Sequence, residues 1–89
     1  MAAYLKPLLR GEYREAAKVA WEKARAANDD FGYHVWVNAA AAAVRCHDQS
    51  YAGRSADFIK WTQGELKDSK GQEIEENPLA DFLAEKKEE

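Results

Sequence analysis

Apolar residues recur every three or four positions along most of the chain, and this spacing predicts helices rather than strands. Between positions 12 and 27, apolar side chains share one helical face while charged side chains occupy the opposite face, which predicts an amphipathic helix. The apolar members of this face are Tyr13, Ala16, Ala17, Ala20, Trp21, Ala24 and Ala27. The sequence has no alternating apolar and polar runs rich in Val, Ile or Thr, so we predict no strand.

The same pattern predicts two further long helices and a short one. A second helix is predicted from about Tyr33 to Cys46, and because it is apolar on nearly every side we place it in the middle of a bundle. A third is predicted from about Ser50 to Lys67, and a short helical turn over residues 2–9 precedes all three. We expect Trp21 and Trp36 to be largely buried, because both lie on apolar helix faces. The expected core face of the third helix consists of Ala52, Ser55, Ala56, Ile59, Thr62 and Leu66.

These elements predict an all-α protein with one folded domain. Residues 1–67 form a small helical bundle of stacked helical hairpins, and residues 68–89 form a polar linker and an acidic C-terminal tail. Within this tail, Asn77 and Pro78 are typical of the N-cap and first residue of a helix, which we predict over residues 78–86. One side of this short helix carries Leu79, Phe82 and Leu83. It either docks on the bundle or remains an exposed peptide motif.

Composition and charge exclude several classes of function. The chain has 89 residues, which is enough for one modest core. Its net charge is −3, and residues 66–89 carry eight acidic and four basic side chains, so we expect no basic face for nucleic acid. No apolar run reaches the roughly 20 residues of a membrane span. A single cysteine, Cys46, and the lack of a secretion signal favour a cytoplasmic protein.

The titratable residues do not match a catalytic or metal-binding pattern. His34 and His47 are thirteen positions apart, which places them on different helix faces and not at the i, i+4 spacing of paired metal ligands. Cys46, His47 and Asp48 include the residue types of a nucleophile, a base and an orienting group, but adjacent side chains cannot point at one another. We therefore expect no enzyme, no cofactor and no small-molecule substrate.

An aromatic and basic surface on the third helix is the main candidate for binding. If the core face centres on Ile59 and Leu66, helical geometry turns Trp61 roughly 140° away from it and places it beside Arg54. Tryptophan and arginine are the residues that most often dominate protein interfaces. The candidate contact residues are Trp61, Arg54, Phe58 and Tyr51. The alternative is internal packing, in which the apolar side of the C-terminal segment covers Trp61.

A polar stripe on the second helix is another candidate. His34, Asn38 and Arg45 lie on one narrow side of an otherwise apolar helix, because they are separated by four and seven positions. Such a stripe either faces solvent or lines a groove that binds a peptide. The sequence leaves both interpretations open.

Two segments of the chain place an alanine three positions after an aromatic residue. The segment from Gly11 to Ala16 is similar to the opening of the second helix of a tetratricopeptide repeat, where glycine, an aromatic residue and alanine recur at this spacing. Trp36, with alanines three and four positions on, resembles the first helix of another unit, and Ala52 falls where its second helix keeps an alanine. The resemblance covers roughly residues 2–67. It implies a scaffold of helical hairpins that binds peptides or protein surfaces.

These observations favour a small protein-binding module, either an adaptor or an inhibitor, whose partner is another protein or a second copy of the chain. One alternative is a homodimeric structural subunit that buries Trp61 and Phe58 between two copies. A more distant alternative is a nucleotide-handling enzyme, because the glycine, tyrosine and alanine of the first long helix also resemble helical domains of the HEPN type. Catalytic members of that family carry an arginine followed after four to six residues by a histidine. Arg45 and His47 are separated by one residue, so catalysis is not expected.

Overall fold

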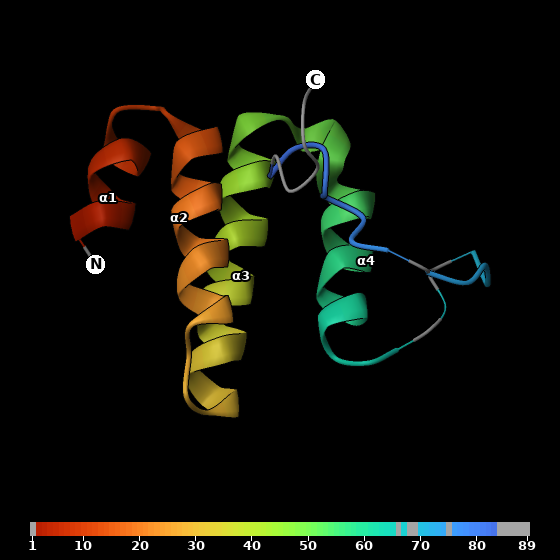
Figure 1. The fold of residues 1–89 in the computed structure, drawn as a ribbon. Helices are drawn as coiled ribbons and strands as arrows, with labels where there is room; N and C mark the ends of the chain where they lie inside the picture. The colour runs from red at the N-terminus through yellow and green to blue at the C-terminus, as the bar shows by residue number, and fades with distance from the viewer. Residues whose placement is uncertain (1, 66, 68–69, 75, 84–89) are drawn as a thin grey trace, which may run out of the picture.

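In the part of the chain that the structure describes, four α-helices and a short 3-10 helix make up the fold, which confirms the predicted all-α class (Figure 1). The computed structural model describes residues 2–65, 67, 70–74 and 76–83. The helices are α1 (Ala2–Leu9), α2 (Tyr13–Arg25), α3 (Asp30–His47), η1 (Gln49–Tyr51) and α4 (Ala52–Thr62). Within these residues there is no strand, only an isolated antiparallel bridge between Lys67 and Glu73. No helix of the described part combines the length and the apolar character needed to cross a bilayer.

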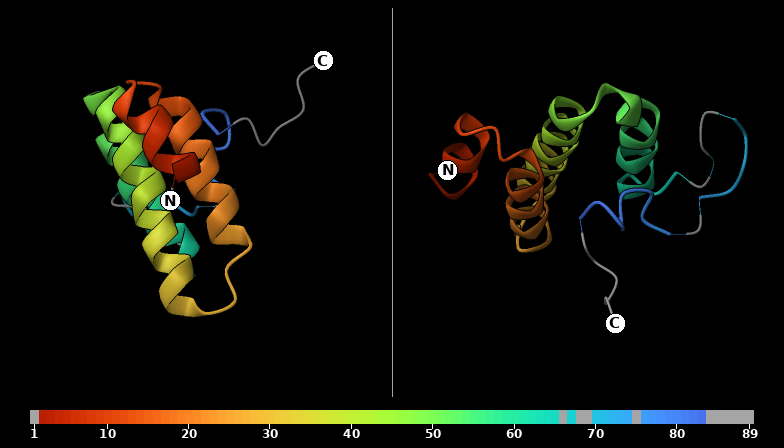
Figure 2. Two further views of the ribbon diagram at one scale, coloured as in Figure 1. Left: turned by 90° about the vertical axis from the view of Figure 1, so that its left-hand side faces the viewer. Right: turned by 90° about the horizontal axis from the view of Figure 1, so that it is seen from above.

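The α2–α3 hairpin lies at the centre of the described fold. The prediction placed α3 alone in the middle, but α3 keeps one exposed side with Phe31 and Val35. In Figure 2, α1 lies against one side of this hairpin and α4 against the other. Tyr4 attaches α1 to α3, because its hydroxyl donates a hydrogen bond to the Ala39 carbonyl (3.1 Å) and its ring meets Trp36 edge-on at 5.8 Å. Burial of the Tyr4 hydroxyl raises the pKa of Tyr4 above its usual value, and the nearby Cys46 thiol contributes to a lesser extent.

Trp21 is buried as expected, whereas Trp36 is only half-buried under α1.

Two glycines set the ends of α1 and α4. Gly11 and Gly64 have φ angles of 80° and 84°, a left-handed conformation that glycine adopts without a steric penalty. After α4, the amide of Gly64 donates to Trp61 O and the amide of Glu65 donates to Lys60 O, the two hydrogen bonds of a Schellman C-cap. The prediction of a helix up to Lys67 is therefore wrong at its C-terminal end, because Gly64 closes the helix after Thr62.

The core face of α4 also differs from the predicted one. Ser55 and Phe58 are the buried residues of this helix, while Ala52 and Ala56 are exposed and Ile59 is only partly buried. Leu66, which the prediction used as an anchor, lies outside the described residues. The physical reason for the different face is aromatic packing: the ring of Phe58 meets Trp21 of α2 edge-on, with centroids 5.1 Å apart. Phe58 is thus a core residue and not part of a contact surface.

Candidate functional site

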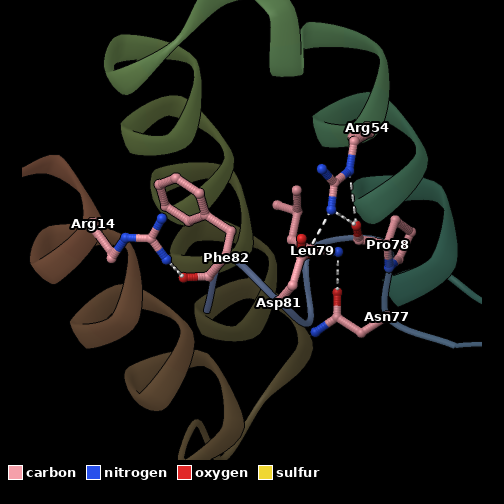
Figure 3. A network of polar contacts seen from close by, with 7 residues as sticks. All are labelled: Arg14, Arg54, Asn77, Pro78, Leu79, Asp81 and Phe82. Atoms are coloured by element: carbon pink, nitrogen blue, oxygen red, sulfur yellow. Dashed lines mark hydrogen bonds and ion pairs between the residues drawn. The ribbon is translucent and has the colours of Figure 1, made fainter. Parts of the chain in front are cut away.

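The C-terminal segment 77–83 lies between α2 and α4, and its apolar side chains are buried there (Figure 3). The exposed fraction of Leu79, Phe82 and Leu83 is 5% or less for each residue. The segment is folded into turns: Asn77 Oδ1 accepts a hydrogen bond from the Leu79 amide (2.9 Å), and the Leu83 amide donates to the Leu79 carbonyl (2.9 Å). Of the two alternatives for this segment, docking is therefore the one observed.

The helix predicted over residues 78–86 has only part of its range in the described chain. Residues 78–83 are turns there, and no regular helix is assigned to them. The last three residues of the prediction lie outside the described residues. Asn77 nevertheless acts as the predicted cap, because its side chain satisfies the Leu79 amide at the start of the first turn.

Arg14 of α2 holds the C-terminal end of this segment. One guanidinium nitrogen, Nη1, donates to the main-chain carbonyl of Phe82 at 2.7 Å, and the guanidinium carbon lies 4.3 Å from the centre of the Phe82 ring. The same ring is met edge-on by His47 at 5.1 Å and by Tyr51 at 5.3 Å. Phe82 is thus enclosed by side chains from α2, α3 and η1.

Arg54 of α4 holds the N-terminal end of the segment. Its Nε and Nη2 atoms donate to the Pro78 carbonyl at 3.2 and 2.9 Å, and Nη2 also donates to the Asp81 carboxylate at 2.5 Å. Partial burial favours the neutral form of Asp81. The hydrogen bond and positive charge of Arg54, with two main-chain amides, outweigh this effect, so the pKa of Asp81 lies below its usual value. The guanidinium also lies 4.8 Å from the centre of the Tyr51 ring.

The site therefore has the chemistry of a peptide-binding groove. Two arginines on opposite walls donate to main-chain carbonyls, and such carbonyls are present in any peptide. The space between these walls is filled by the apolar side chains of the segment. In Figure 3 the segment runs between Arg14 and Arg54 with α3 behind it.

The predicted contact residues lie in three places: the groove, the aromatic cluster around Trp21, and the polar stripe of α3. Arg54 and Tyr51 lie in the groove, where their predicted role toward a partner stays a prediction. Trp61 is half-buried and packs on Phe58 and Trp21, with centroids 6.3 and 6.2 Å apart. Among the described aromatic rings, Phe82 pairs with His47 and Tyr51 and not with Trp61, whose ring partners come from α2 and α4.

The polar stripe of α3 does not join the groove. Asn38 is exposed and donates from Nδ2 to the His34 carbonyl at 2.8 Å, one turn earlier in the helix. The ring of His34 meets only Tyr33 edge-on among the described aromatic rings, at 5.4 Å. Arg45 is half-buried, and its carbonyl accepts from Gln49 Nε2.

Arg14 and His47, which contact Phe82 of the segment, were not among the predicted contact residues. Arg14 belongs to the charged face of the first predicted helix, and that pattern alone assigns it to solvent. His47 was considered only as a base or metal ligand. One sequence feature could have indicated these contacts. The apolar triplet Leu79, Phe82 and Leu83 in a polar tail suggests that some surface of the bundle buries it. In the described part of the chain, no three His, Cys, Asp or Glu side chains are grouped to bind a metal ion.

No family model, curated protein or solved structure matches the chain. The resemblance to the tetratricopeptide repeat therefore stays a prediction.

Proposed function

We propose that the protein is a small protein-binding module whose groove between α2 and α4 takes a short segment of a partner protein. The observation that supports this proposal is the way in which residues 77–83 are held. Leu79 and Phe82 are fully or almost fully buried, while Arg14 and Arg54 donate to the carbonyls of Phe82 and Pro78.

The chemistry of residues 77–83 defines the partner segment. It carries apolar side chains at positions i, i+3 and i+4, as Leu79, Phe82 and Leu83 do. A carboxylate two positions after the first apolar residue pairs with Arg54, as Asp81 does. The rim beside Arg14 is an open hollow of about 570 Å³ at the start of α2, whose charged lining combines Arg14 and Lys18 with Glu12 and Glu15. Because the two signs balance there, the acidic preference of the site comes from Arg54 alone.

The chain's own segment competes with any such partner. A linker of 14 residues, 63–76, joins it to the bundle and keeps it at an effective concentration on the order of millimolar. A partner must therefore bind more tightly than the chain's own segment or make contacts beyond the groove. This arrangement suits an adaptor or inhibitor that opens only for a well-matched partner.

Binding of a labelled peptide with the sequence of residues 76–83 tests this proposal. The full-length Phe82→Ala variant should bind the peptide at least about tenfold more tightly than the wild type, because its own segment docks more weakly. Asp81→Asn is a milder variant that leaves the core intact, and it should give a smaller increase. Circular dichroism checks that both variants keep the helix content of the wild type.

Additional substitutions separate groove binding from non-specific binding. Adding Arg14→Ala to Phe82→Ala should reduce peptide binding, whereas adding Lys23→Ala, on the exposed side of α2, should not. If folded Phe82→Ala and Asp81→Asn bind the peptide no better than the wild type, the groove is not a site for peptides in trans, and the proposal fails.

A further inference from the structure

The exposed large apolar side chains are confined to two helices. Among the described residues they are Leu5 and Leu9 on α1, with 41% and 83% exposure, and Phe31 and Val35 on α3, with 78% and 43%. None is on α2 or α4. Exposed apolar side chains that gather on one side of a small protein often mark a contact surface.

The outer side of α3 carries a regular seam. Phe31, Val35, Asn38, Ala42 and Arg45 follow one another at spacings of four, three, four and three positions. This is the spacing at which helices pack along a coiled-coil contact. The first three members are exposed and the last two half-buried, so most of the seam is open to solvent in the described chain. Between Asp30 and Arg45 the helix has no Asp, Glu, Lys or Arg, a depletion typical of the centre of an interface.

We propose that this outer face of α3 pairs antiparallel with the same face of a second copy, around a two-fold axis at Asn38. Asn38 is the centre of the seam, because Phe31 and Arg45 are each seven positions from it. Antiparallel pairing places Phe31 of one copy beside Ala42 and Arg45 of the other, where the small alanine leaves room for the ring. A contact of this kind is closed after two copies.

The charges at the two ends of the seam favour antiparallel over parallel pairing of the two α3 helices. The seam begins beside Asp30 and ends at Arg45, and neither residue has an ion-pair partner within the described chain. Antiparallel pairing brings Asp30 of each copy close to Arg45 of the other. Parallel pairing brings equal charges together at both ends, which is unfavourable.

Asn38 fixes the register of the pair. It is the one uncharged polar residue in the seam, so pairing places it opposite its own copy at the two-fold axis. A single buried asparagine at such a position selects register and orientation, because in any other register its amide faces apolar side chains. One N–H of this amide already donates to the His34 carbonyl, which leaves its oxygen available as an acceptor for the partner copy.

This face is separate from the peptide groove. Viewed from above, residues 77–83 lie on the α2 side of the molecule (Figure 2). The seam is on the side of α3 that faces away from α2, because Val37, Ala40 and Val44 on the opposite side of α3 are buried. A dimer through α3 therefore leaves both grooves accessible and would present two partner segments together.

The mass in solution, measured by light scattering or sedimentation over a range of concentrations, tests the pairing. The wild type should change from 10.0 kDa toward twice that mass as its concentration rises. Val35→Arg should stay at the monomer mass, and Glu22→Arg, on the exposed side of α2, should behave like the wild type. A wild-type protein that remains monomeric up to about 1 mM overturns the proposal, because even a weak dimer is populated there.

A charge exchange tests the orientation. Asp30→Arg and Arg45→Asp should each weaken association at least about tenfold, because each brings like charges together across the pair. The double variant should recover most of the wild-type association, since every cross-pair contact again joins opposite charges. Circular dichroism of each variant checks that the helices remain. If the double variant, folded, associates no better than the single ones, the antiparallel register is wrong.

Discussion

Trp21 is the residue on which most of the aromatic core converges. Its ring lies 5.1 Å from Phe58, 6.2 Å from Trp61 and 6.5 Å from Tyr33, and so connects α2 with α3 and α4. Truncation of a buried tryptophan leaves a cavity that a small domain cannot refill. We expect Trp21→Ala to lower the free energy of unfolding by about 3–5 kcal/mol. Trp36→Ala should cost clearly less, because Trp36 is only half-buried. Urea unfolding followed by circular dichroism measures both.

Trp21→Phe is the matched control for this prediction. The indole nitrogen of Trp21 is buried without a hydrogen-bond partner among the described residues, so loss of its N–H breaks no bond. The phenylalanine variant should therefore retain more stability than the alanine variant. Equal losses for Trp21→Ala and Trp36→Ala would show that the aromatic cluster does not dominate the core.

The sequence predicted Trp21 correctly and Phe58 wrongly, for a physical reason. Trp21 is on a face whose other positions are alanine and whose opposite side is charged, so only one side can be buried. Phe58 and Ile59 are adjacent on a helix that has apolar residues on several sides, and the choice between them rotates the predicted face by about 100°. Packing against Trp21 selects Phe58, and no pattern within one helix contains that information.

At the scale of elements, the end of α4 depends on one backbone conformation. An alanine at position 64 would have to adopt the left-handed φ of 84° that the C-cap requires, although a Cβ there would meet no neighbouring atom. We expect Gly64→Ala to lower the free energy of unfolding by about 1 kcal/mol, because strain is the only change.

Gly53→Ala is the opposite case within the same helix. Gly53 lies inside α4 with a helical φ, and a Cβ there also meets open space. This substitution should raise the free energy of unfolding by about 0.5–1 kcal/mol, because alanine loses less conformational entropy in a helix. Thermal or urea unfolding of the two variants measures the effect of backbone conformation alone, because neither added Cβ makes a new contact. A stabilised Gly64→Ala would contradict the proposed role of the C-cap.

The number and order of the helices were predictable because each is encoded locally. Periodicity indicates α1, α2 and α3 to within about three residues, and Gly11 marks the end of α1. The same glycine signal was present at position 64, but the prediction continued through it toward Leu66. An isolated glycine inside an apolar pattern is ambiguous, since helices tolerate it in their interior at a modest cost.

At the scale of the whole molecule, the groove depends on contacts that no local pattern predicts. Arg14 and the Phe82 carbonyl are 68 positions apart in sequence, and Arg54 and Pro78 are 24 apart. An apolar triplet in a polar tail predicts that the tail needs a partner surface, but not whether that surface belongs to the chain itself. Only the arrangement of α2, α3 and α4 in space decides where the segment lies.

Cleavage of the linker tests whether the tail is held by the groove or only by its covalent connection. Lys67 and Lys70 are exposed and lie outside the helices, so trypsin should cut there first. Docking of the released segment then becomes bimolecular. The unfolding midpoint of the cut protein should therefore rise with protein concentration, as it does for any ligand that binds the folded state. The Val35→Arg background removes the contribution of α3 pairing from this measurement.

The intact Val35→Arg chain is the control, and its midpoint should not depend on concentration.

Acid should weaken reassociation of the cut protein, because docking lowers the pKa of Asp81. A lowered pKa means that the docked state favours the ionised carboxylate. This contribution is present above the usual pKa of aspartate and is lost as the pH falls through the lowered value.

If the cut protein unfolds at the same midpoint at every concentration, the segment contributes no docking energy of its own. The bundle is then stable without it, and Arg14 and Arg54 hold a dispensable tail.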